Sequence, residues 1–116
     1  MKISTLMSYA HGFVGATEEI VEMEKAGLDV VWVPEAYSFD GVSAMGYIAA
    51  KTKKVTIASG ILNIYSRTPS LMAMTAAGID SLSEGRCMLG LGASGPQVIE
   101  GFHGIAYDPP MTRIRE

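Results

Sequence analysis

The chain has 116 residues, 48% of them hydrophobic, and a formal net charge of -3 at pH 7. This length suits one small domain with a buried core and excludes two complete domains. The negative charge, with no basic run beyond Lys51, Lys53 and Lys54, argues against a nucleic-acid or anionic-membrane partner.

The single cysteine and the N-terminal segment bear on the compartment. Cys87 lies in an apolar stretch, so we expect a buried structural thiol, no internal disulfide and a reducing environment. The first residues lack the apolar run of a signal peptide, and no window approaches the roughly 20 apolar residues of a membrane span. We therefore expect a cytoplasmic protein.

In chain order, apolar runs and turn residues predict alternating strands and helices. Thr17 is the expected N-cap of the first helix, with Glu18 and Glu19 in its first turn and glycine past its end. The expected strands are 3–8, 29–33, 54–59 and an apolar strand after Gly85. The expected helices are 17–26, 40–51, 70–83, a short one at 97–102 and the start of another at 111–116, with a loop at 61–69.

The strand-helix order predicts an α/β fold with parallel strands and right-handed crossovers. Ile3, Val30, Thr56 and Cys87 are separated by 27, 26 and 31 residues, close to the roughly 31 residues per unit of a closed eight-unit barrel. The sequence therefore predicts the N-terminal half of a (β/α)8 TIM barrel, about four βα units in one domain, 1–116, ending within the fourth helix. Two strand edges would stay unpaired unless another copy, a partner or a C-terminal half covers them.

Polar and small residues follow each predicted strand, where ligands bind in parallel α/β folds. For His11 and His103 a loop hydrogen bond is favoured over catalysis, while for Glu35 a helix cap and a ligand contact stay open. Glycine at the end of a buried strand, as at Gly60, is typical of a bulge or of close approach to a ligand. The residues at these ends are Ser8, Tyr9, His11, Glu35, Ser59, Gly60, Ile61, Asn63, Gly92, Ala93, Ser94, Gly95 and Gln97.

The stretch from Gly90 to Pro96 is a strand followed by a glycine-rich loop, with proline suited to a helix start. Such a loop can bind a phosphate through backbone N–H groups, or it can be a turn that needs small residues for packing. Its G-x-G-x-x-G spacing also matches a dinucleotide fingerprint. However, the match sits in the fourth strand, and no acid ends a strand about 20 residues later, which disfavours a nicotinamide cofactor.

Several motifs in this order resemble the luciferase-like monooxygenase superfamily, specifically its deazaflavin-dependent (coenzyme F-420) oxidoreductases. The likeness covers essentially the whole chain. It is carried by the segments 24–29, 31–35, 50–52, 60–69, 85–97 and 100–104.

The resemblance implies an oxidoreductase that transfers a hydride between a substrate carbon and coenzyme F-420. It implies a non-prolyl cis peptide at about Gly60–Ile61 behind the cofactor ring, Glu35 facing the ring pocket, and residues 92–97 near the cofactor tail. Ala36 stands where relatives often carry histidine, so no proton donor is transferred and the catalytic residues stay unknown. No metal is implied.

Three alternatives stay open at this point. FMN would replace the deazaflavin if the chain belongs with the flavin monooxygenases. A non-catalytic half-barrel would serve as an assembly module whose edges pair with another subunit. The nicotinamide-binding domain is the third and least favoured. With half of a barrel we expect weak or absent catalysis, a small-molecule substrate, and either a homo-oligomer or dependence on a C-terminal half.

Overall fold

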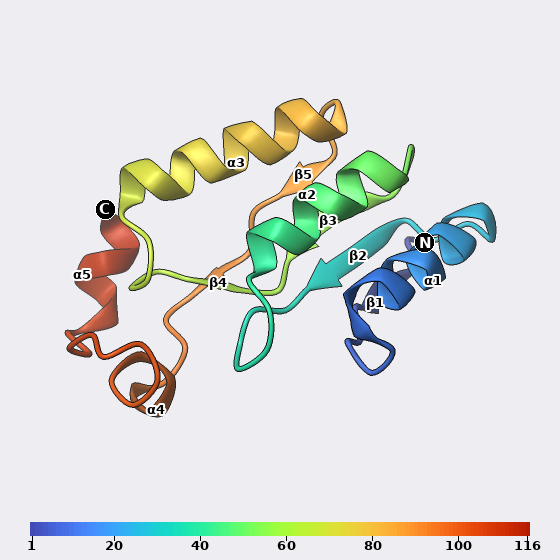
Figure 1. Cartoon of the computed structure of the whole chain (residues 1–116). Helices are drawn as coiled ribbons and strands as arrows, with labels where there is room; N and C mark the ends of the chain where they lie inside the picture. Colours follow the sequence, from blue (N-terminus) through green and yellow to red (C-terminus); the bar gives the residue numbers. More distant parts are fainter.

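The computed structural model describes residues 1–116, in which helices alternate with short parallel strands (Figure 1). The strands are β1 (Ser4–Leu6), β2 (Val30–Val33), β3 (Thr56–Ser59), β4 (Leu62–Asn63), β5 (Cys87–Met88) and β6 (Leu91–Gly92). The helices are α1 (Gly12–Lys25), α2 (Gly41–Lys51), α3 (Pro69–Ser83), α4 (Pro96–Ile99) and α5 (Pro110–Arg115).

The main sheet has the strand order β1-β2-β3-β5, and every neighbouring pair is parallel. Consecutive strands are therefore neighbours, as in a barrel, and the order never reverses as it does in a doubly wound sheet. The predicted α/β fold with a partial barrel is confirmed. None of the helices has the length and the continuous apolar stretch that a membrane span requires.

The main core lies between the sheet and the helices α1, α2 and α3. Val31, Val33 and Ile57 point from the strands into this core, where they meet Met45 and Ile48 of α2. Because side chains alternate along a strand, Trp32 and Ala58 point to the opposite face of the sheet. The helices thus cover one face, which in a closed barrel is the outer face.

The helix boundaries follow the predictions except at the start of α1 and at the end of α4, which stops at Ile99 and not at residue 102. Asp40 and Thr68 are side-chain N-caps of α2 and α3, accepting from Ser43 N and Leu71 N. The prediction of Thr17 as the N-cap of α1 is wrong: α1 begins five residues earlier at Gly12. Thr17 is buried inside the helix, and its hydroxyl donates to the Phe13 carbonyl at 3.0 Å.

Two of the predicted strands are interrupted and resume as a second, two-stranded sheet. β3 pairs with β5, and β4 pairs with β6. Paired residues are 30 positions apart in sequence in the first pair of strands (Ala58 and Met88) but 29 apart in the second (Leu62 and Leu91). One extra residue therefore lies between β3 and β4, as in a β-bulge. The predicted loop at 61–69 thus begins with a strand.

The amino-terminal ends of the strands are fixed by two charged residues. One oxygen of Glu24, Oε1, accepts the N–H groups of Lys53, Lys54 and Val55 at 2.7 to 2.9 Å, joining α1 to the start of β3. Arg86 donates to the carbonyls of Ala49, Thr52, Val55 and Ser83 and to the Thr52 hydroxyl. Both residues therefore lie at the amino-terminal ends of the strands. In barrels this end contributes to stability, whereas the active site lies at the opposite end.

Candidate functional site

The interruption between β3 and β4 lies at the carboxyl end of the sheet and contains a non-prolyl cis peptide, Gly60–Ile61. The resemblance implied a cis peptide at this position, and the structure confirms it. Around it the Ser59 hydroxyl makes two hydrogen bonds to one residue, accepting Gly90 N–H at 2.8 Å and donating to the Gly90 carbonyl at 2.8 Å. The serine side chain thus joins the two interrupted strands where the backbone ladder is broken.

Glycine is required at Gly90 because the two strands come very close here. A Cβ atom on Gly90 would lie 2.1 Å from the Ser59 carbonyl oxygen, which is backbone and cannot rotate away. A Cβ on Gly92 would lie 3.0 Å from Cδ1 of Ile61. Gly90 and Gly92 of the predicted phosphate loop therefore have a packing role beside the cis peptide.

A buried ion pair fixes the neighbouring loop. Arg67 Nη1 donates to Glu35 Oε1 at 2.6 Å and Nη2 to Glu35 Oε2 at 2.9 Å, with 12% and 9% of the two side chains exposed. Arg67 Nη2 also donates to Asp40 Oδ1 at 2.9 Å, and Gly41 N–H donates to Glu35 Oε2 at 2.8 Å. One guanidinium therefore ties the segment after β4 to the β2–α2 loop and to the start of α2.

The surroundings shift the pKa values of this cluster. Hydrogen bonding to Glu35 raises the pKa of Arg67. Partial burial by itself would raise the pKa of Asp40, but hydrogen bonds from Ser43 and the nearby Arg67 charge lower it. Burial raises the pKa of Tyr9, and Glu35 and Asp40 raise it further. Tyr9 is therefore a neutral donor at pH 7, and its hydroxyl donates to the Pro34 carbonyl at 3.1 Å.

A cleft of about 310 Å³ opens beside this ion pair. It lies at the end of the sheet where the β2–α2 loop and the segment around α4 both project (Figure 1). Ser66 lines the cleft, and its hydroxyl is buried and has no hydrogen-bond partner. Its lining residues are Glu35, Ala36, Ser38, Phe39, Asp40, Ser66, Arg67, Leu71, Phe102 and His103.

The remaining predicted residues continue from the same strands. Asn63 is buried, and its Oδ1 accepts the N–H groups of Tyr65 and Ser66 at 3.1 and 2.8 Å. Ala93 packs against a small core of Ile64, Tyr65 and Ile99. In the loop 94–97, Ser94 has a left-handed φ of 54°, Gly95 precedes α4, and Gln97 lies in it.

The model of the family described as luciferase-like monooxygenase matches residues 2–116. The chain belongs to this family. A Mycobacterium tuberculosis protein, provisionally named a coenzyme F-420-dependent oxidoreductase, is 38% identical over 99 residues, which are 85% of this chain and 28% of the relative. The chain thus spans less than a third of that relative's length.

Two solved structures of much longer chains share the fold. The coenzyme F-420-dependent tetrahydromethanopterin reductase of Methanopyrus kandleri aligns with a TM-score of 0.76 and 23% identity over 89% of this chain and 29% of that chain. The oxygenating constituent of the 3,6-diketocamphane monooxygenase of Pseudomonas putida, solved with FMN, aligns with a TM-score of 0.84 and 20% identity over 99% and 37%. At these identities the likeness shows the fold alone.

In this luciferase-like chain, sequence reasoning missed Arg67 although a signal was present. Arg67 is the only lysine or arginine in the loops that follow the strands. It also missed an aromatic cluster in which the ring of Phe39 lies 5.1 Å from that of Tyr9 and 5.7 Å from that of Phe13. The two predicted loop histidines differ: His11 pairs with Glu19 at 2.7 Å, and His103 lines the cleft.

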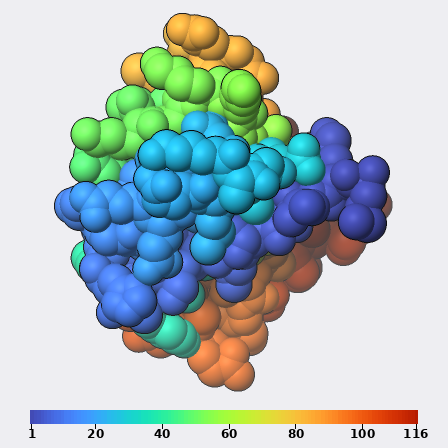
Figure 2. Space-filling model, turned by 90° about the vertical axis from the view of Figure 1, so that its right-hand side faces the viewer, coloured from blue at the N-terminus to red at the C-terminus, as the bar shows by residue number.

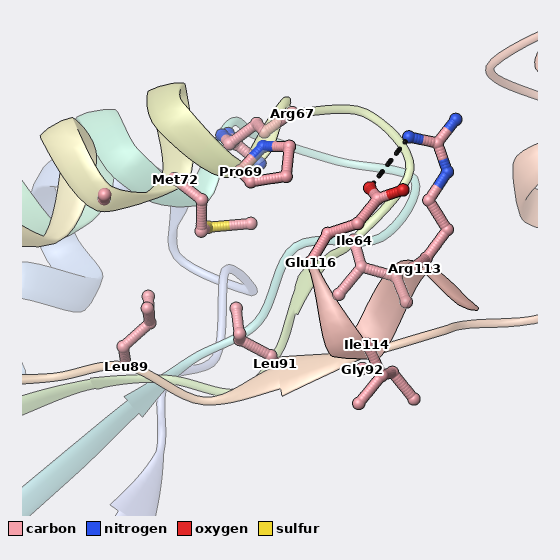
Figure 3. Close-up of a pocket in the computed structure, with 11 residues that line it drawn as sticks. Ile64, Arg67, Pro69, Met72, Leu89, Leu91, Gly92, Arg113, Ile114 and Glu116 are labelled. Carbon is pink, nitrogen blue, oxygen red and sulfur yellow. Dashed lines mark hydrogen bonds and ion pairs between the residues drawn. The ribbon is translucent and has the colours of Figure 1, made fainter. Parts of the chain in front are cut away.

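A second cavity, of about 350 Å³, lies between α3, β6 and α5 (Figure 3). Met72 of α3 and Leu91 of β6 line it, and Arg113 and Glu116 form an ion pair at its rim. Apart from this pair and Arg67, its lining is apolar. The cleft beside the Glu35–Arg67 pair therefore has more polar residues in its lining than this second cavity of the luciferase-like chain.

Cys87 is less buried than the sequence predicts. Its side chain is half-buried at the β5 edge of the sheet. Burial raises the pKa of its thiol, and the nearby Asp80 charge raises it further. The thiol is therefore protonated at pH 7, as expected of a structural cysteine.

Proposed function

We propose that this chain is the N-terminal part of a luciferase-like oxidoreductase that transfers a hydride between a small-molecule substrate carbon and coenzyme F-420. The observation that carries the proposal is the interrupted strand at Gly60–Ile61, held by Ser59 and Gly90, in a member of this family. The provisional name of the 38% identical relative supports the deazaflavin over other cofactors.

The residues at the interruption fit the face of a planar ring. Gly60, Gly90 and Gly92 have no side chains, and Ile61 contributes an apolar surface against Gly92. Such a wall is uncharged and held by two strands. When bound, a deazaflavin supplies the carbon that accepts or donates the hydride, while the protein supplies position and a dry surface.

The Glu35–Arg67 pair has a positioning role in this proposal. Both oxygens of Glu35 are occupied, Oε1 by Arg67 and Oε2 by Arg67 and Gly41 N–H. A carboxylate held in this way is not free to move a proton. We therefore propose that Glu35 shapes the pocket wall and that Ala36, an alanine beside it, leaves room for ring or substrate.

The loop 92–97 is proposed to lie near the cofactor tail, together with Ser59, Gly60, Ile61 and Asn63 along the ring. No lysine or arginine occurs in this loop. Any contact with a tail phosphate would therefore come from backbone N–H groups, the Ser94 hydroxyl or the Gln97 side-chain amide. The charge that balances the phosphate would have to come from outside these residues.

A fluorescence titration tests the choice of cofactor. Coenzyme F-420 and FMN are each titrated into the purified chain and into the product of its complete gene, and emission is followed to saturation. Saturable binding of F-420 with much weaker binding of FMN is the expected result. Tighter FMN binding would replace the proposal with an FMN-dependent monooxygenase, for which the diketocamphane enzyme provides the fold precedent.

Turnover tests the second part of the proposal. The 116-residue chain provides one wall of the site, so we expect no measurable oxidation of reduced F-420 by this chain alone. The product of the complete gene is the comparison. Turnover by the isolated chain at a rate similar to that of the complete product would show that the other wall is not needed.

A further inference from the structure

The polar side chains that line the cleft beside the Glu35–Arg67 pair fall into two groups. In the first group, both oxygens of Glu35 and both oxygens of Asp40 already accept hydrogen bonds, and Arg67 donates to both carboxylates. The second group is Ser66 and His103, which line the cleft without a side-chain hydrogen bond inside the chain. Hydroxyl and imidazole groups can each donate and accept. The cleft thus contains two neutral side chains whose hydrogen-bonding capacity is unused.

The Ser66 hydroxyl needs a partner that the fold does not provide. Buried polar atoms in proteins are nearly always hydrogen-bonded, and an unpaired one lowers stability. The residue itself is only partly buried and lines the cleft. Rotation about its Cα–Cβ bond between staggered positions therefore turns the hydroxyl into the cleft. A ligand in the cleft can supply the missing partner.

The apolar part of the lining is largely aromatic. Phe39, Leu71 and Phe102 contribute it, from the β2–α2 loop, α3 and the segment after α4. The Phe102 ring meets the Tyr37 ring edge to face, with centroids 5.4 Å apart. In Figure 2 the β2–α2 loop, teal, lies at the lower end of the molecule beside the orange segment that follows β6. Such walls suit a planar, apolar ligand body.

The charge of the lining disfavours an anion. Glu35 and Asp40 are negative and Arg67 is positive, so these three groups sum to one negative charge. None of the lining residues belongs to β1, β5 or α5. The cleft is therefore complete without the open edges of the sheet and without the last helix.

We propose that this cleft binds a small neutral molecule with a planar, apolar body and a carbonyl or hydroxyl oxygen, and that Ser66 and His103 hydrogen-bond to its polar end. The cleft volume of about 310 Å³ suits a small ligand. Its role as the substrate-binding part of the hydride-transfer site rests on the proposed function, whereas the binding preference does not.

A titration with acetophenone, a neutral aryl ketone, tests the proposal on the chain without cofactor. A carbon-13 correlation spectrum follows the ring Cε1–H signals of the two histidines, and the loss of one signal in His103→Phe identifies His103. We expect a saturable shift at His103 and little change at His11, which pairs with Glu19 outside the cleft. Benzoate has the same ring with a negative charge, and it should bind at least about threefold more weakly.

Two pairs of variants test the hydrogen bonds, with Kd measured from backbone amide shifts. His103→Phe keeps a ring without its nitrogen atoms, and Ser66→Ala removes only the hydroxyl. Each should raise the Kd for acetophenone by about threefold to tenfold. His11→Phe and Ser81→Ala make the same substitutions outside the cleft and should leave Kd unchanged. In urea, Ser66→Ala should be at least as stable as wild type, because the hydroxyl it removes has no partner.

Three results would overturn the proposal: no His103 shift up to the solubility limit of acetophenone, tighter binding of benzoate, or an unchanged Kd in both cleft variants. The titration contains no coenzyme, so its outcome is independent of the F-420 titration. Failure here with F-420 binding intact rejects the assignment of the cleft alone. Acetophenone binding without F-420 binding supports the cleft as a binding site and rejects the proposed function.

Discussion

Arg67 has a larger effect on stability than its position in a loop suggests. Arg67→Gln leaves the buried Glu35 carboxylate with only Gly41 N–H, and breaking a buried pair in this way costs about 3 kcal/mol of unfolding free energy. Urea unfolding measures the loss. The matched control is Arg113→Gln, which removes a solvent-accessible pair with Glu116 and should cost less than about 0.5 kcal/mol.

A double variant separates the charge from the shape of the pair. Arg67→Gln combined with Glu35→Gln removes both charges, so it should be more stable than Arg67→Gln alone. Equal stability of the single and double variants would contradict the role assigned to the Glu35 charge.

Gly90 is the residue at which the strands come closest. Gly90→Ala places a methyl group on the Ser59 carbonyl, and the two strands must separate, at a cost of about 3 kcal/mol. Gly78→Ala is the control, because Gly78 lies on the exposed side of α3 and a Cβ there would meet no atom within 4 Å. This control should stabilise the chain by about 0.5–1 kcal/mol. Thermal melts of both variants measure these changes in stability. A Gly90→Ala variant as stable as wild type would contradict the close approach of the two strands.

At the scale of elements, Glu24 connects α1 to the start of β3. Partial burial would raise its pKa, but hydrogen bonds from the N–H groups of Val55, Lys54 and Lys53 outweigh this and lower the pKa from 4.5. The stabilisation is therefore complete above about pH 4.5 and is lost as the pH falls through the lower pKa of the folded state.

Glu24→Gln should remove part of that acid dependence. At pH 7 the variant should lose about 1 kcal/mol, because a neutral amide oxygen accepts the three N–H groups less strongly. Below pH 4 the difference from wild type should shrink. Urea unfolding between pH 3 and pH 7 measures both, and a difference that does not change with pH would contradict the assignment to the carboxylate.

The order and type of the elements could be predicted from the sequence, but not the features that contacts distant in sequence decide. α2 begins after Asp40 as predicted, because the capping signal is local. α1 does not begin at Thr17, because Ala16 and Thr17 are buried against the core and packing extends the helix toward Gly12. Sequence reasoning missed β4 because its strand character comes from pairing with β6, which periodicity does not reveal.

At the scale of the whole molecule, the spacing of apolar runs is sufficient to predict a partial parallel barrel. It also predicts that polar residues gather at the carboxyl ends of the strands. What the spacing cannot give is the partner of each polar group. For Glu35 a helix cap and a ligand contact are both compatible with the sequence, and the structure adds its pairing with Arg67, a residue 32 positions away.

The central claim is that the interrupted strands form the wall of a cofactor site. The most direct measurement is a nitrogen-15 amide spectrum of the chain, recorded while coenzyme F-420 is added. We predict shifts concentrated at residues 59–63 and 90–97, with little change at Gly78 on the exposed side of α3. Shifts confined to the outer helices, or none at saturating cofactor, would contradict the claim.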